Sequence, residues 1–107
     1  MCAWLKFTNE VIMTDEQKTL AAAVETYGAE HQMWVFVGEC GELFDAMSDH
    51  RRGRCDIDHV AEEIADVEIM LDQLMIIYQC RDAVKAWRRK KLKRLWLWLK
   101  GNENRVD

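Results

Sequence analysis

The chain has 107 residues, half of them hydrophobic, with a net charge of −4, five glycines and no proline. This length favours a single domain, and a domain this small buries only a modest share of its surface, so self-association would help to stabilise it. Helix-forming residues dominate the composition, which favours an all-α protein.

The first part of the chain predicts an extension and two helices. Residues 1–13 do not share the pattern of the rest and are assigned to an N-terminal extension, within which Met13 is an alternative natural start. A first helix is expected over 14–27, capped by Thr14 or Asp15 and ended by Gly28. A second is expected over 29–48, followed by a polar loop over 48–56.

The second part predicts two further helices. One starts at Asp56 or Asp58 and runs to about Cys80, and the other covers 82–99 and ends at Gly101. Residues 100–107 form a tail that is expected to fray. Together these segments predict a four-helix bundle-like domain over 14–99.

Apolar residues recur at spacings of three and four in both central helices. The third helix carries a predicted bundle seam of Val60, Ile64, Val67, Leu71, Leu74 and Tyr78. The second helix carries an apolar face of Met33, Phe36, Val37, Cys40, Leu43, Phe44 and Met47. Gly38 and Gly41 lie inside that helix, and each lowers its stability by about 1 kcal/mol relative to alanine. We therefore expect a neighbouring helix or a ligand to approach closely there.

Four cysteines and the hydropathy pattern restrict the cellular setting. No cysteine pair has the CxxC spacing of a zinc knuckle or a redox motif. Residues 1–13 lack the features of a signal peptide, and no apolar run approaches the length of about 18 residues that a membrane span needs. We expect a cytoplasmic protein with reduced thiols and no membrane contact.

Two acidic pairs border the predicted seam. Glu39 and Glu42 lie three residues apart on the second helix, and Glu63 and Asp66 repeat that spacing on the third. If these helices pack antiparallel, the pairs face each other, and their mutual repulsion requires either raised pKa values or a cation. Oxygen ligands select a hard ion, so Mg²⁺ is expected, with Mn²⁺ as a substitute. The alternative is a solvated acidic surface. The histidines match no ligand spacing, so iron and zinc are not expected.

The acidic pairs carry a resemblance to a known family. Glu39-x-x-Glu42, twenty intervening residues and then Glu63-x-x-Asp66 resembles the signature of the all-α nucleoside triphosphate pyrophosphohydrolases, the MazG-like superfamily. The contexts GECGEL and EEIADVEIMLDQL are also similar, and the resemblance covers about residues 14–99. Gly38 stands where members often carry a glutamate, which leaves the number of metal ions open.

The resemblance implies hydrolysis of a nucleoside triphosphate between its α and β phosphates, giving a monophosphate and pyrophosphate. Glu39, Glu42, Glu63 and Asp66 would hold Mg²⁺. Catalytic roles are expected for Glu39, Glu62 and Glu63, with Glu62 or Glu39 taking the proton of the attacking water. The expected substrate contacts are Gln32, Trp34, Lys85, Arg88, Lys91 and Arg94, with His31 and Phe36 as further candidates near the base. For a chain of this size, the resemblance also implies a homodimer or a dimer of dimers.

A non-enzymatic reading starts from the C-terminal helix. Residues 81–100 hold nine of the fifteen basic residues and one acid, Asp82. Such a helix could bind nucleic acid or a protein partner without catalysis. The negative net charge argues against nucleic acid. We therefore keep a non-catalytic helical bundle as the alternative function.

Overall fold

The computed structural model describes residues 13–103, which form four α-helices and no strand. The helices are α2 (Asp15–Tyr27), α3 (Ala29–Arg51), α4 (Ile57–Ile77) and α5 (Arg81–Glu103). The all-α class and the four helices are confirmed. Apart from Met13, the predicted N-terminal extension lies outside the described residues. None of the four described helices is long and apolar enough to cross a membrane.

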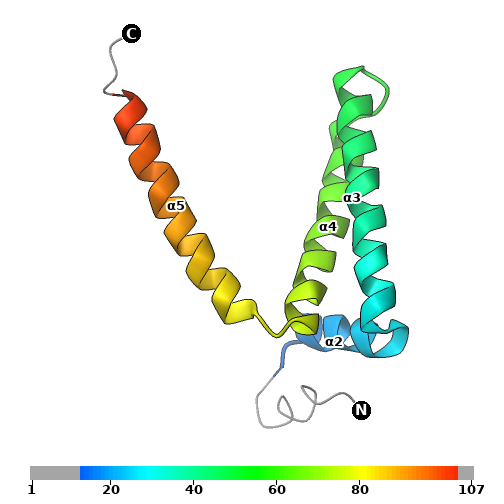
Figure 1. Cartoon of the computed structure of the whole chain (residues 1–107). Helices are drawn as coiled ribbons and strands as arrows, with labels where there is room; N and C mark the ends of the chain where they lie inside the picture. The colour runs from blue at the N-terminus through cyan, green and yellow to red at the C-terminus, as the bar shows by residue number, and fades with distance from the viewer. Residues whose placement is uncertain (1–12, 104–107) are drawn as a thin grey trace.

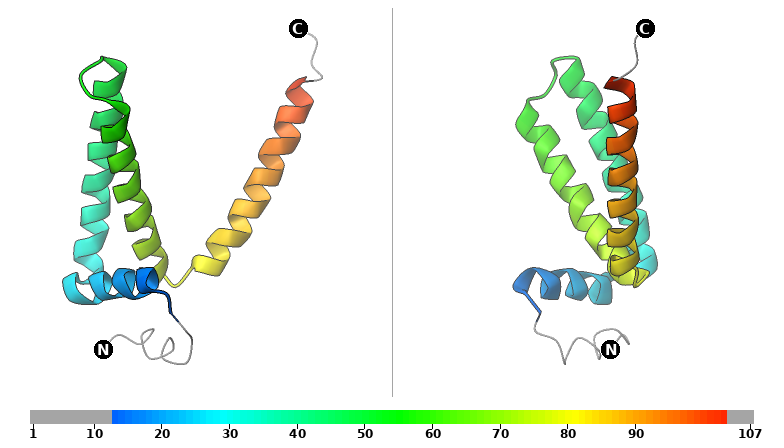
Figure 2. Two further views of the ribbon diagram at one scale, coloured as in Figure 1. Left: turned by 180° about the vertical axis from the view of Figure 1, so that it is seen from behind. Right: turned by 90° about the vertical axis from the view of Figure 1, so that its left-hand side faces the viewer.

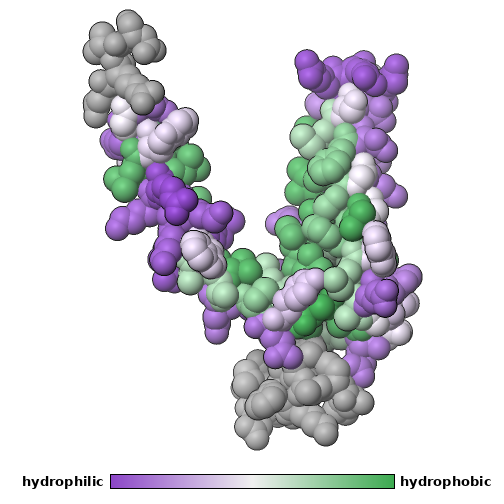
Figure 3. Space-filling view, viewed as in Figure 1, coloured by the Kyte–Doolittle hydropathy of each residue, from purple (hydrophilic) through white to green (hydrophobic). Residues whose placement is uncertain are grey.

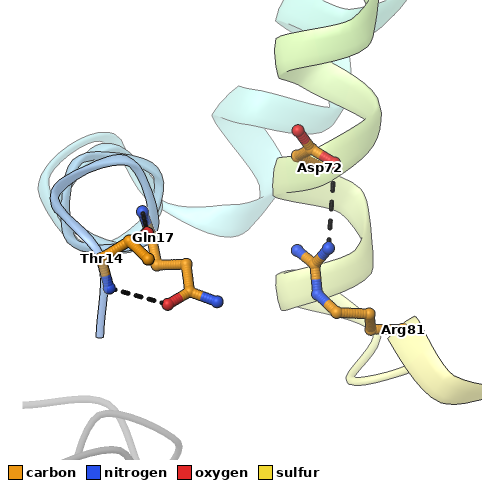
Figure 4. Close-up of polar contacts among 4 residues, drawn as sticks. All are labelled: Thr14, Gln17, Asp72 and Arg81. Atoms are coloured by element: carbon orange, nitrogen blue, oxygen red, sulfur yellow. Dashed lines mark hydrogen bonds and ion pairs between the residues drawn. The ribbon is translucent and has the colours of Figure 1, made fainter. Parts of the chain in front are cut away.

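Helix α2 begins and ends at the predicted residues. The Thr14 hydroxyl accepts the Gln17 backbone N–H at 3.1 Å, and the Gln17 side chain accepts the Thr14 N–H at 2.9 Å, which is a capping box (Figure 4). Gly28 ends the helix with φ of +90°, a conformation that glycine adopts without steric cost. The chain then turns directly into α3.

Helices α3 and α4 form an antiparallel hairpin, and α2 crosses its base (Figures 1 and 2). Helix α3 ends at Arg51, three residues later than predicted, because the chain after it closes hydrogen bonds back to Asp49 and His50. The loop is therefore limited to residues 52–56. Asp56 caps α4 by accepting a hydrogen bond from the His59 backbone N–H at 3.0 Å. Asp56 is one of the two residues predicted to cap this helix.

A three-residue link joins α4 to α5. Helix α4 ends at Ile77, earlier than the predicted Cys80, because Gln79 adopts a positive φ of 52° and the Cys80 N–H bonds the Met75 carbonyl. Helix α5 runs on to Glu103. The prediction that it ends at Gly101 is wrong, since residues 101–103 continue the helix. The fraying expected for these residues stays a prediction.

Helix α5 diverges from the hairpin, as Figure 1 and the left view of Figure 2 show. It meets α4 only at its start, where Arg81 pairs with Asp72 at 4.0 Å (Figure 4). All residues from 82 to 101 are exposed. Within one chain, three helices pack and the fourth lies outside, so the predicted bundle is not closed.

The core lies where α2 meets the base of the hairpin and between α3 and α4. Its buried apolar side chains are Leu20, Ala21, Val24, Ala46, Val60 and Met70. The predicted seam on α4 is only partly buried: Ile64, Leu71 and Tyr78 are 45%, 41% and 59% exposed. The apolar band of α4 is wider than its contact with α3, so part of it stays uncovered, and apolar surface is visible along the hairpin in Figure 3.

The two mid-helix glycines of α3 have open surroundings. A Cβ atom added at Gly38 or Gly41 would meet no atom within 4 Å. The close approach expected there does not occur within residues 13–103. Both glycines therefore lower the stability of α3 without a compensating contact from the described part of the chain.

Candidate functional site

Three carboxylates converge where α3 and α4 face each other. Glu39 comes from α3, and Glu63 and Asp66 come from successive turns of α4. One oxygen from each of the three lies within 4.8 Å of the others. Glu63 is only 5% exposed, and the other two are half-buried. The antiparallel packing thus brings together three of the four carboxylates that the spacing singled out.

Two oxygens in this cluster have no hydrogen-bond partner. Glu39 Oε2 and Glu63 Oε2 are both buried, and neither contacts a donor among residues 13–103. Buried polar atoms are satisfied in the large majority of cases, because an unpaired one loses its hydration without replacement. Charged oxygens gathered in this way therefore lack the compensation that a cation would provide.

The pKa values of the cluster reflect the same lack of compensating positive charge. Burial raises the pKa of Glu39 above its ordinary value of 4.5, and the charges of Asp66, Glu42 and Glu63 raise it further. Burial also raises the pKa of Glu63, as do the charges of Glu42 and Asp66, while His59 acts in the opposite direction. Both groups bind protons more readily than free carboxylates do, so they are good candidates for holding a cation or accepting a proton.

The remaining acidic candidates lie at the exposed edge of the cluster. Glu42 is exposed, one turn along α3 from Glu39, and its charge raises the pKa values of Glu39 and Glu63. Glu62 is also exposed and lies with His59 and Glu63 in a second group whose ligand atoms are within 4.8 Å of one another. Reasoning from the sequence missed His59, although its spacing of three and four residues from the two glutamates was a usable signal.

Gln32, an expected substrate contact, is engaged inside the protein. Its side chain is 5% exposed, and its Nε2 donates to Gln73 Oε1 at 2.7 Å. Gln73, which is 4% exposed, in turn donates to the Met70 sulfur at 3.5 Å. This buried amide pair links α3 to α4 and leaves Gln32 little surface to offer a ligand.

The other expected substrate contacts, Trp34 and the four α5 cations, are exposed and are not among the residues of the carboxylate cluster. Trp34 is 69% exposed and lines an apolar groove of about 430 Å³ with Met33, Val37, Leu74 and Tyr78. Phe36 lines the same groove, whereas His31 lies beside Tyr27, with ring centroids 6.1 Å apart. The four expected cations all lie on the diverging helix α5: Lys85, Arg88, Lys91 and Arg94.

No family model, curated protein or solved structure matches this chain. The resemblance to the MazG-like superfamily therefore depends on the residues and spacing of the two acidic pairs, together with the all-helical fold.

Proposed function

We propose that this protein is a MazG-like pyrophosphohydrolase that cleaves a nucleoside triphosphate between its α and β phosphates with the help of a divalent cation. The observation that carries the proposal is the meeting of Glu39, Glu63 and Asp66 around two buried, unpartnered oxygens. A merely solvated acidic surface would keep its carboxylates in water, whereas Glu63 is 5% exposed.

The residues present fit a hard cation. All three ligand groups are carboxylates, which suit Mg²⁺ or Mn²⁺. Glu39, Glu63 and Asp66 would hold the ion, with Glu42 at the exposed edge. When bound, such an ion offsets the carboxylate repulsion, draws in the phosphates and stabilises the charge that develops on them.

The chain itself supplies a base for the attacking water. Glu39 has a raised pKa, so we assign proton acceptance to the Glu39 oxygen that does not hold the cation, in preference to the exposed Glu62. The water oxygen then bonds to either the α or the β phosphorus. The bond between that phosphorus and the oxygen that bridges the two breaks, and the leaving phosphate group keeps the electron pair of this bond. Glu63 and Asp66 keep the reacting groups in place.

Beyond the divalent cation, the triphosphate needs positively charged side chains. The α5 cations diverge from the cluster within one chain, and a neighbouring copy could bring them to it. We therefore propose that the enzyme acts as a homodimer or a dimer of dimers. The exposed Trp34 remains the candidate for stacking on the base.

The test is pyrophosphate release from a panel of ribo- and deoxyribonucleoside triphosphates with Mg²⁺. The parent is compared with a Glu63→Gln/Asp66→Asn double variant and with a Glu16→Gln control, which alters an exposed acid on α2. We expect release by the parent and the control and none by the double variant. Equal release by all three, or none by a folded parent with any nucleotide, contradicts the proposal.

A further inference from the structure

Helix α5 carries a stripe of three apolar and two basic side chains that no other part of residues 13–103 covers. Its residues follow one another at spacings of four and three along the helix. We call this set the α5 stripe: Val84, Arg88, Lys91, Leu95 and Trp98. Its apolar members are 38%, 49% and 64% exposed. Most of the stability of a helix in a protein comes from packing an apolar face against another surface. Some surface is therefore needed to cover the α5 stripe.

The same chain carries a matching stripe on α4. We call Ile64, Glu68, Leu71, Met75 and Tyr78 the α4 stripe, which has the same spacing. Ile64, Glu68 and Leu71 are exposed, whereas Tyr78, at the C-terminal end of the stripe, also donates from its hydroxyl to the Met33 sulfur of α3 at 3.8 Å. At 21 and 23 residues, α4 and α5 are about 31 Å and 34 Å long. Each stripe is thus long enough to cover the other along most of its length.

The charges within the two stripes are complementary. Arg88 and Lys91 lie between the apolar Val84 and Leu95 in the α5 stripe, so a surface that buried these two cations would need to supply negative charge. Glu68 is the acid of the α4 stripe. All three side chains are exposed, and none forms a hydrogen bond or ion pair with residues 13–103. Packing one stripe on the other would pair these charges.

The link between α4 and α5 holds the two stripes apart within one chain. Backbone hydrogen bonds from Tyr78, Gln79 and Cys80 reach back to the last turn of α4, and Arg81 pairs with Asp72. The radius of gyration is 18.2 Å, against about 13 Å for a compact domain of this length. The covering surface is therefore expected to come from another molecule.

The exposed apolar side chains fit a second copy. The α4 stripe and helix α5 leave large apolar side chains exposed, among them Ile64, Leu71, Trp87, Leu95 and Trp98. Interfaces of obligate dimers are largely apolar and bury about 2,000–5,000 Å² in total, so a second copy of the chain suits this surface. Because each copy offers both stripes, a two-fold arrangement satisfies both at once.

We propose that two copies exchange α5, so that the α5 stripe of each lies on the α4 stripe of the other and Arg88 and Lys91 pair with the partner's Glu68. This inference rests on the self-association proposed above and not on the hydrolase activity. It gives two of the four α5 cations a role in assembly, and leaves Lys85 and Arg94 as the candidates for phosphate contact.

Charge reversal tests the exchange. We compare Glu68→Arg, Arg88→Glu/Lys91→Glu, the triple reversal and a control, Arg89→Glu/Lys93→Glu, which makes the same charge change outside the α5 stripe. Sedimentation over a concentration series measures association, and far-UV circular dichroism checks helicity. Breaking a buried charge pair should raise the dissociation constant at least about 30-fold in the first two variants. The triple reversal and the control should associate like the parent.

Mixing separates exchange from folding back within a chain. In an exchanged dimer of the Glu68→Arg chain with the Arg88→Glu/Lys91→Glu chain, opposite charges meet at both contacts. The equimolar mixture should therefore restore the dimer that neither variant forms alone. An associated parent whose variants associate equally well overturns the exchange, as does a mixture that stays monomeric. A parent that is monomeric at every concentration overturns self-association as well. Pyrophosphate release from the same samples judges the hydrolase proposal separately.

Discussion

The buried amide pair gives the sharpest prediction about stability. Gln32 and Gln73 are 5% and 4% exposed, and 2.7 Å separates the donor from the acceptor. Replacing Gln73 by methionine leaves the Gln32 amide buried without its acceptor. The cost of such an unsatisfied group is about 1–3 kcal/mol. In a domain of this size, each kcal/mol lowers the Tm by about 4–8 °C.

Thermal unfolding of four proteins tests this reasoning: the parent, Gln32→Leu, Gln73→Met and the double variant. We expect each single variant to lose stability, and the double variant to recover most of it, because an apolar pair leaves no orphaned polar group. Protein concentration is held fixed, since Tm depends on it in an oligomer. The buried pairing would be refuted if the single variants had the same Tm as the parent. It would also be refuted if the double variant lost as much stability as the two single variants together. The KM for nucleotide should not change in variants that are folded at the assay temperature.

Four further outcomes follow from the cluster, the groove and the helix cap. Because the folded-state pKa values of Glu39 and Glu63 are raised, the Tm in EDTA should fall as the pH rises above the ordinary value of 4.5, and it should fall less in the Glu39→Gln/Glu63→Gln variant; an identical slope would contradict this. Mg²⁺ at a hundred times its Kd should stabilise the parent by about 2.7 kcal/mol and leave that variant unchanged in thermal shift; equal shifts would argue against the site. Trp34→Ala should raise KM for nucleotide while changing stability by less than about 0.5 kcal/mol, and an unchanged KM would exclude base stacking there. Thr14→Ala should cost about 1 kcal/mol in urea unfolding, whereas Thr14→Ser should retain most of the stability; equal losses would contradict capping by the hydroxyl.

The meeting of the carboxylates was predictable from the sequence because it depends on two local regularities. A three-residue step keeps Glu63 and Asp66 on one side of a helix, and a short loop makes the next helix antiparallel. The caps at Thr14 and Asp56 were predictable for the same reason, since each depends on a side chain three residues from its partner.

Longer-range features were not predictable from periodicity. The Gln32–Gln73 bond joins residues 41 positions apart, and helical spacing does not show which polar side chains will pair. The burial of Ile64 and Leu71 was overestimated because an apolar pattern shows that a surface needs covering, not which surface covers it. The direction of α5 depends on the positive φ of Gln79, a residue whose sequence gives no clear turn signal.

The most direct test of the central proposal is ³¹P nuclear magnetic resonance of a nucleoside triphosphate incubated with the protein and Mg²⁺. The account predicts equal amounts of nucleoside monophosphate and pyrophosphate, and no reaction when Glu63→Gln/Asp66→Asn replaces the parent. Formation of a diphosphate and inorganic phosphate would place the cleavage at another bond. An unchanged spectrum with folded parent, across the nucleotide panel, would contradict the proposal that Glu39, Glu63 and Asp66 form a hydrolytic site.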